Sequence, residues 1–322
     1  MNSKSSIMQA IAALLITSTF VAATVAPAQS PPAPKYASGQ ADLSDPTRVD
    51  IALVLAVDVS SSVKSNERRF QREAYAAALS DPRVADMALG GGAGRVAIAY
   101  MEWSGTRYQR VLQPMTVMSS RRELQAFAQN ILAIEDVPND PMFVQPTAVG
   151  DALIAAEAAM AALPFRAQDY IIDISGDGVI NDGSGVTAAR ERLLSMGLTV
   201  NGLPIEVAGE TPGVRDPSFE HVARFYQDCV IGGPGAFHLI ARGFADVRET
   251  LIMKLMLEMA QLPASEKRRL AWAWNTDRQR TYAQVIPAIA LQLAPSDPPK
   301  TAKVDCGDPR RTTSGNPFNV QP

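Results

Sequence analysis

The chain has 322 residues, of which 30 are lysine or arginine and 33 are aspartate or glutamate, so its formal net charge at pH 7 is −3. A mildly acidic chain lacks the clustered basic surface that nucleic-acid-binding proteins use, and we expect no nucleic-acid partner. The length is ample for a sizeable hydrophobic core.

The first 28 residues have the layout of a secretory signal peptide. Lys4 precedes an apolar stretch, and residues 26–28 (APA) form a small-x-small cleavage site. A transmembrane anchor is the alternative, but Gln9 and the polar residues 17–19 interrupt the stretch. No later segment is long and apolar enough to span a bilayer, so we expect a periplasmic or secreted protein with no stable membrane span.

Residues 29–48 are rich in proline, serine and alanine and show no hydrophobic periodicity, which predicts a linker. From residue 49 onward, apolar runs typical of buried strands alternate with stretches of helical spacing. In chain order the pattern predicts strand 49–57, helix 65–81, strands 95–103 and 108–117, helix 119–134, a loop and an alanine-rich helix within 144–164, strand 169–175, helix 186–197, strand 198–207, helix 216–230, strand 236–242 and helix 244–260.

Strands that alternate with helices predict one α/β domain over residues 49–261, with a doubly wound, mainly parallel sheet and helices on both faces. In the strand order 3-2-1-4-5-6, the first and fourth strands are neighbours where the order reverses. Beyond residue 262 the pattern fades. Residues 265–275 are compatible with one more helix, and residues 262–322 as a whole are expected to be a partly disordered extension.

Two cysteines are present, Cys229 and Cys306. Because paired cysteines usually bond in an oxidising compartment, export predicts a disulfide between them. The alternative is a buried Cys229 and an unpaired Cys306. Neither lies beside a histidine or in C-x-x-C spacing, which argues against a thiolate zinc site or a redox centre.

Side chains with oxygen atoms stand at the ends of two expected strands. Asp58, Ser60 and Ser62 follow the first strand, Asp177 follows the fourth, and Thr147 opens the alanine-rich helix. Because the first and fourth strands are expected to be neighbours, their loops should face each other across one crevice. Oxygen ligands without histidine or cysteine suit magnesium, manganese or calcium rather than zinc or copper.

Taken in order, the D-x-S-x-S loop at 58–62, the threonine and the second aspartate resemble the metal-ion-dependent adhesion site (MIDAS) of von Willebrand factor type A (vWA) domains. The resemblance covers about residues 49–261 and implies a Rossmann-like vWA fold. The stretches VDIALVLAVDVSSSV, ISGDGVIND and IGGPGAF are also similar to the bacterial exported DUF1194 group. One departure is that Ser175 and Gly176 precede Asp177, where vWA domains usually have strand, aspartate and glycine in direct succession.

The resemblance implies that these five side chains hold a divalent cation, Mg²⁺ or else Mn²⁺ or Ca²⁺, which keeps an open position. An aspartate or glutamate of a protein partner then becomes the last ligand. The favoured function is an exported protein-binding module that is not an enzyme. Two alternatives stay open. One is a divalent-metal hydrolase of phosphate or ester substrates, for which the motifs show no general base, nucleophile elbow or histidine. The other is a structural domain with an unoccupied site.

Three further residues have a functional or structural interpretation. Trp103, at the end of the second strand, either forms a partner-binding rim with residues 179–185 or packs against a neighbouring loop. Asp173 is either a carboxylate behind the metal ligands or a buried, hydrogen-bonded residue. Asp151, one turn after Thr147, is expected to be either a solvated acid or an acid in the first turn of its helix, where it suits the helix dipole.

Overall fold

The structure is a computed structural model that describes residues 35–36, 47–136, 145–162, 166–206, 219–276 and 306. All of them belong to the second of two compact units, Pro34–Pro322. The expected signal peptide lies outside the described residues. None of the helices in the described part combines the length and the hydropathy needed to cross a bilayer.

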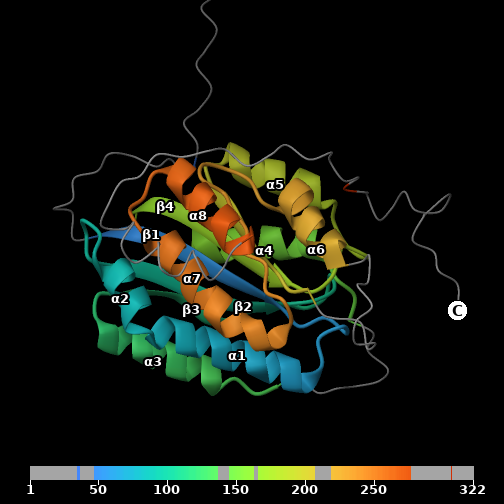
Figure 1. The fold of residues 1–322 in the computed structure, drawn as a ribbon, viewed down its shortest axis with the longest axis horizontal. Coiled ribbons are helices and arrows are strands. Elements are labelled where there is room, and N and C mark those ends of the chain that lie inside the picture. Colours follow the sequence, from blue (N-terminus) through green and yellow to red (C-terminus); the bar gives the residue numbers. More distant parts are fainter. Residues whose placement is uncertain are drawn as a thin grey trace, which may run out of the picture. The chain divides into compact units, whose positions relative to one another are not determined.

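Five strands form one sheet in the order β3-β2-β1-β4-β5 (Figure 1). They are β1 (Arg48–Asp58), β2 (Val96–Trp103), β3 (Gln109–Met118), β4 (Arg166–Gly176) and β5 (Thr199–Pro204). β1 pairs in parallel with β2 and with β4, β4 pairs in parallel with β5, and β3 runs antiparallel to β2. The predicted doubly wound, mainly parallel sheet is therefore confirmed, with the first and fourth strands side by side.

Helices cover both faces of the sheet because its central strand is apolar on both sides. In β1, Ile51, Leu53 and Leu55 face one core, whereas Ala52 and Val54 face the other. The first core contains side chains of α1, α2, α3, α7 and α8, and the second contains side chains of α4, α5 and α6. The helices are α1 (Ser65–Ser80), α2 (Pro82–Leu89), α3 (Arg121–Leu132), α4 (Val149–Ala161), α5 (Val186–Ser195), α6 (Phe219–Phe225), α7 (Val247–Met259) and α8 (Ala264–Thr276), with a π-helical turn at Tyr226–Val230 and a 3₁₀ turn at Phe244–Asp246.

The expected strand 236–242 is wrong. The segment pairs with residues 202–206 through only two isolated parallel bridges. The amides of Leu239 and Ala241 donate to the carbonyls of Gly202 and Pro204 at 3.1 and 3.0 Å. Pro204 has no amide to donate in return, so the ladder is interrupted at this residue.

Helix α2 was not predicted from the sequence. It begins directly after α1, where Asp81 accepts a hydrogen bond from the amide of Arg83 at 2.8 Å and Pro82 occupies the first turn. Both features favour a helix start, because an aspartate side chain satisfies a free amide and proline has none to satisfy. The expected helix over 265–275 is confirmed as α8.

Side chains attach two segments outside the helices and strands to the rest of the domain. Within the expected linker, the hydroxyl of Tyr36 donates to Glu157 on α4 at 2.8 Å, and the ammonium of Lys35 donates to the same carboxylate at 2.7 Å. Cys229, in the π-helical turn, forms a disulfide with Cys306, across a Cα–Cα distance of 5.5 Å. The predicted disulfide is confirmed.

Candidate metal centre

The two loops that carry the predicted aspartates leave the sheet at the same edge. Asp58 is the last residue of β1, and Asp177 directly follows the last residue of β4. The two strands pair in parallel, with Val57 opposite Ser175, so their carboxyl ends lie at one level. Loops at the carboxyl ends of adjacent parallel strands are the usual place for a ligand in this class of sheet.

A chain of hydrogen bonds links four of the five predicted ligands. The amide of Ser60 donates to Oδ1 of Asp58 at 2.7 Å. The hydroxyls of Ser60 and Ser62 lie 3.1 Å apart, and the hydroxyl of Ser62 donates to Oδ1 of Asp177 at 2.6 Å. The structure therefore brings Asp177 to a loop that lies more than a hundred residues earlier in the sequence, and so assembles two carboxylates and two hydroxyls.

Thr147, the fifth predicted ligand, lies beside the same loops. Its amide donates to Oδ1 of Asn181 at 2.7 Å, and the amide of Asn181 donates back to the carbonyl of Thr147 at 3.1 Å. Its Oγ1 is 3.7 Å from where a Cβ on Gly178 would stand. On the other side, the amide of Ser61 donates to the carbonyl of Gln145 at 2.9 Å. Segment 145–147 is thus bonded to both aspartate loops.

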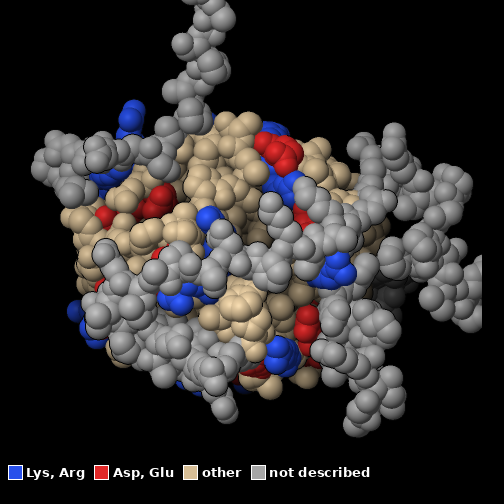
Figure 2. Space-filling view, turned by 45° about the horizontal axis from the view of Figure 1, so that its top comes forward, with Lys and Arg blue, Asp and Glu red and all other residues tan. Residues whose placement is uncertain are grey.

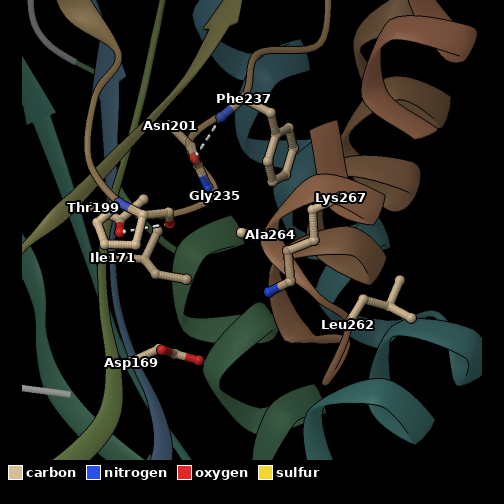
Figure 3. Close-up of a pocket in the computed structure, with 10 residues that line it drawn as sticks. Asp169, Ile171, Thr199, Asn201, Gly235, Phe237, Leu262, Ala264 and Lys267 are labelled. Carbon is tan, nitrogen blue, oxygen red and sulfur yellow. Dashed lines mark hydrogen bonds between the residues drawn. The ribbon is translucent and has the colours of Figure 1, made fainter. Parts of the chain in front are cut away.

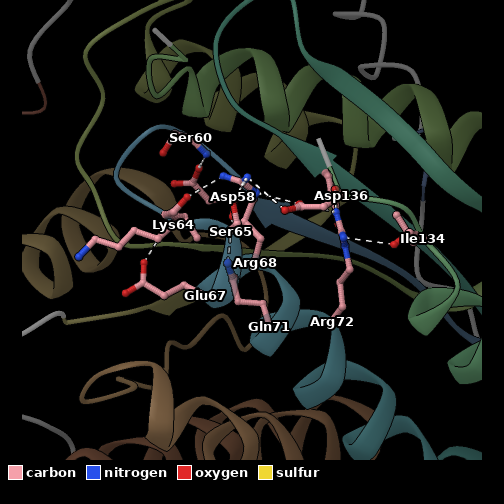
Figure 4. A network of polar contacts seen from close by, with 12 residues as sticks. Asp58, Ser60, Lys64, Ser65, Glu67, Arg68, Gln71, Arg72, Ile134 and Asp136 are labelled. Atoms are coloured by element: carbon pink, nitrogen blue, oxygen red, sulfur yellow. Dashed lines mark hydrogen bonds and ion pairs between the residues drawn. The ribbon is translucent and has the colours of Figure 1, made fainter. Parts of the chain in front are cut away.

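Helix α1 holds the D-x-S-x-S loop at both ends (Figure 4). Gln71 Nε2 donates to the carbonyl of Asp58 at 3.1 Å, and the Arg68 guanidinium donates to the carbonyl of Val63 at 2.8 Å. These contacts fix where the loop leaves β1 and where it enters the helix. Sequence reasoning missed both residues, although polar side chains three positions apart on a buried helix face were a usable signal.

Burial controls the charge state of the two carboxyl groups. Asp58 has no exposed surface, and Ser60 and Thr147 are also buried. Burial and the neighbouring Asp177 carboxylate together raise the pKa of Asp58 to about 8, although the hydrogen bonds from Ser60 lower it. Burial also raises the pKa of Asp177, against the hydrogen bond from Ser62. Two desolvated carboxylates at close range destabilise each other's charged form, and a cation between them would remove that penalty.

The donor set fits a hard divalent cation. Oδ2 of Asp58 is buried and has no hydrogen-bond partner among the described residues, so this oxygen is available to coordinate a cation. No group of three or more His, Cys, Asp or Glu side chains suitable for a metal ion occurs in the described ranges. The candidate centre therefore depends on hydroxyl oxygens as much as on carboxylates, as suits magnesium, manganese or calcium.

Comparison with known families assigns the chain to one of them. Residues 48–263 match the family model described as "Protein of unknown function (DUF1194)". The chain belongs to the DUF1194 family. The predicted DUF1194 membership is thereby confirmed, and no curated protein matches the chain.

Several solved structures resemble the DUF1194 chain in part. The pilus adhesin SpaC from Lactobacillus rhamnosus GG is 14% identical with a TM-score of 0.45, and the match covers 66% of this chain and 30% of SpaC. The mussel byssus protein PTMP1, in a form described with a zinc-occupied MIDAS motif, is 13% identical with a TM-score of 0.41, over 66% and 46% of the two chains. The SpRpn10 VWA domain is 12% identical with a TM-score of 0.42, over 66% and 98%. The chain spans less than half the length of the first two, and at this level of similarity the neighbours do not indicate what it binds.

Trp103 does not form a rim in the DUF1194 structure. It is fully buried and belongs to the second core, so the packing alternative is confirmed and the partner-contact alternative is wrong. Asp151 lies in the first turn of α4, as one of its two alternatives predicted. Its carboxylate accepts hydrogen bonds from the amide and hydroxyl of Ser184, at 2.8 and 3.0 Å, and so fixes the loop that follows Asp177.

Asp173 lies inside the domain rather than behind the metal ligands. Together with Lys254 and Glu258 it forms a fully buried ionic group, with Lys254 Nζ 2.7 Å from Asp173 and 2.5 Å from Glu258. The buried alternative for Asp173 is therefore confirmed, with an ion pair as its main contact. This group joins β4 to α7.

A separate pocket of about 160 Å³ lies between β4, β5 and the start of α8 (Figure 3). Asp169 lines it from β4 and Lys267 lines it from α8 on the other side, and the apolar side chains of Ile171 and Phe237 also line it. Asp169 and Ile171 lie well before the carboxyl end of β4, so this pocket is distinct from the candidate metal centre.

The surface visible in Figure 2 mixes charges of both signs. Blue and red side chains are interspersed over the described residues of that face, and no broad area of one sign covers them. Such a face does not provide the continuous basic area that a nucleic acid binds.

Proposed function

We propose that this DUF1194 protein is an exported, metal-dependent protein-binding module. A divalent cation is held by Asp58, Ser60, Ser62, Thr147 and Asp177, and an aspartate or glutamate of a partner protein completes its shell. The observation that carries the proposal is the continuous contact between Asp58, the two serines and Asp177, with a buried carboxylate oxygen left over.

Charge balance explains why such a site favours an acidic partner. The carboxylates of Asp58 and Asp177 together cancel the charge of a divalent cation, and the hydroxyls of Ser60, Ser62 and Thr147 add no negative charge. The site therefore carries little net charge that would repel an incoming carboxylate. When bound, the cation supplies a Lewis-acidic position to which an anionic oxygen coordinates.

The neighbouring loop is suited to partner selection. Residues 179–185 follow Gly178, and each of them is at least partly exposed. Hydrogen bonds with Asp151 and Thr106 hold two of these residues in place. The carboxylate of Asp182 accepts the amide of Thr106 at 3.1 Å, which links this loop to the turn after β2. A partner whose acidic side chain reaches the cation would contact this surface next.

Ion binding is tested by thermal unfolding of chelator-stripped protein. Mg²⁺ or Mn²⁺ should raise the melting temperature, because an ion present at 100 times its dissociation constant stabilises the folded state by about 2.7 kcal/mol. Asp58→Ala and the double variant Ser60→Ala, Ser62→Ala should abolish the shift. The matched control is Ser119→Ala with Ser120→Ala, two serines at another strand-to-helix turn, which should keep the ion-induced shift.

Partner binding is tested by capture from the native exported fraction with and without chelator. A partner should be retained in magnesium and lost in chelator, and changing one of its acidic residues to alanine should remove most of the affinity. Equal affinity in both conditions would contradict the mechanism. Turnover of a generic phosphoester that disappears with Asp58→Ala would favour the hydrolase alternative instead.

A further inference from the structure

Tyr226 reaches the candidate metal centre from a part of the chain that the motifs do not include. It is the first residue of the π-helical turn and is fully buried. Two glycines make room for it. A Cβ on Gly202 would lie 2.7 Å from Cδ1 of the Tyr226 ring, and a Cβ on Gly176 would lie 2.7 Å from its hydroxyl. Any larger residue at these positions would push the tyrosine away from the site.

The space beside Gly176 is shared by two unsatisfied polar atoms. The same Cβ on Gly176 would lie 2.8 Å from Oδ2 of Asp58. Within the described part of the chain, neither this oxygen nor the Tyr226 hydroxyl has a hydrogen-bond partner. A buried donor and a buried acceptor left unpaired in one small space are unfavourable, and a bond between them satisfies both.

The hydroxyl is able to donate at neutral pH. Burial raises the pKa of Tyr226 well above its ordinary value, and the nearby carboxylates of Asp58, Asp177 and Asp173 act in the same direction. The phenol therefore keeps its proton. A carboxylate oxygen accepts more than one bond, so a hydrogen bond from Tyr226 does not compete with a cation on Asp58.

The backbone that carries Tyr226 is held in two ways. The amide of Ile231 donates to the carbonyl of Tyr226 at 3.0 Å and closes the π-helical turn, and Cys229 in that turn is bonded to Cys306. A π-helical turn inserts one extra residue into a helix, and such turns occur often at functional sites. Here the turn places an aromatic hydroxyl beside a carboxylate that belongs to β1.

We infer that Tyr226 is a positioning residue of the metal centre: its hydroxyl donates to Oδ2 of Asp58 and holds that carboxylate in the orientation that binds the cation. The consequence of this hydrogen bond, a higher affinity for the ion, rests on the proposed function. It is independent of the identity of the partner protein.

The test compares Tyr226→Phe with the wild-type protein by titration of chelator-stripped samples with Mg²⁺ and Mn²⁺ in a calorimeter. Loss of a residue that orients a metal ligand typically weakens metal binding by about 10-fold to 100-fold, and we expect a loss in this range. The ion affinity should also need a higher pH to reach its maximum, because a carboxylate without its donor ionises less readily. Tyr100→Phe is the matched control, since Tyr100 is equally buried but donates to Glu102 in the other core.

A second measurement uses the ion-free protein. The Raman doublet of the Tyr226 ring, isolated as the difference between wild type and Tyr226→Phe, reports whether its hydroxyl donates a hydrogen bond. We expect a donor signal that is lost in Asp58→Ala. If the wild-type protein does not bind the ion, the proposed function is contradicted. The Raman measurement still tests whether Tyr226 donates to Asp58, because it needs no ion.

Two results would overturn the inference. One is an ion affinity and pH profile for Tyr226→Phe that equal those of the wild type while the wild type binds the ion. The other is a Tyr226 Raman signal that does not change in Asp58→Ala. A fall in affinity of the same size in Tyr100→Phe would also overturn it, because the effect would then follow from any buried tyrosine.

Discussion

Asp58 combines full burial with an incomplete set of hydrogen bonds. Its Oδ1 is bonded to the amide of Ser60, whereas Oδ2 has no partner among the described residues. The D-x-S-x-S loop, taken in order with Thr147 and Asp177, selected Asp58 from the sequence. Tyr226 could not be selected in this way, because its position beside Asp58 depends on a π-helical turn and on two glycines that are remote from it in the sequence.

The raised pKa of Asp58 predicts how stability depends on pH. In the folded, ion-free protein this group holds its proton up to about pH 8, whereas an unfolded aspartate loses its proton near its ordinary value of 3.8. The stabilising contribution is therefore present at low pH and is lost as the pH rises between these two values. We expect the melting temperature in chelator to fall as the pH rises from about 4 to about 8, and saturating Mg²⁺ to reduce or reverse this fall.

Asp58→Asn is the control for the pH experiment. Burial raises the pKa of Asp173 to about 7, which gives a contribution of the same sign, and the neighbouring Lys254 opposes it. The asparagine variant keeps the Asp173 contribution and removes that of Asp58. A slope that is identical in wild type and Asp58→Asn would show that Asp58 does not titrate in this range.

Helix α1 is the element that fixes the D-x-S-x-S loop. Its periodicity predicted a helix, but the buried face carries Arg68, Gln71 and Arg72 where an apolar stripe was expected. Gln71 and Arg68 hold the loop, and Arg72 binds Glu102 of β2 through two bonds of 2.6 and 2.8 Å. The helix is thus attached to two neighbouring strands by polar contacts.

Removal of the buried guanidinium of Arg72 should lower the free energy of unfolding more than removal of an exposed guanidinium. Arg72 and Glu102 are 5% and 1% exposed, so Arg72→Ala leaves a buried carboxylate without its partner. Breaking such a pair costs about 3–5 kcal/mol. Arg69→Ala on the same helix, where the side chain is 80% exposed, should change the free energy of unfolding by less than about 0.5 kcal/mol. Urea titration measures both, and equal values would contradict the expected difference.

The elements differ in how well their sequence predicts them. β1 was predictable because nine consecutive residues suit a strand that is buried on both faces. The segment 236–242 has the same apolar character, yet its ladder with residues 202–206 is interrupted at Pro204, which has no amide to donate. The pairing partner comes from another part of the sequence, so only the folded structure reveals the interruption. The same reason applies to Gln71 and the loop it holds.

At the scale of the whole molecule, long-range covalent and ionic links supplement the core. The buried group of Asp173, Lys254 and Glu258 attaches α7 to the sheet, and the disulfide attaches Cys306 to the turn that carries Tyr226. The cysteine pairing followed from the even count and the expected export. The ionic group did not, because nothing in the spacing of Asp173 and Lys254 relates the two residues.

Loss of the disulfide should lower global stability. The bonded cysteines are 77 residues apart, and the chain-entropy model gives a stabilisation of about 4 kcal/mol for a loop of this size. Cys306→Ser should therefore lower the free energy of unfolding by up to about this amount in urea titration. Peptide mapping without reductant provides the control, and two free thiols in the wild-type protein from an oxidising compartment would contradict the bond.

The disulfide also makes part of the chain a closed covalent ring. The polypeptide from Cys229 to Cys306 returns to its own starting point through two sulfur atoms. A single protease cut anywhere within this ring leaves the two products joined, so they migrate together until a reductant separates them. Helices α7 and α8 lie within the ring, and such a cut would leave them covalently attached to the rest of the protein.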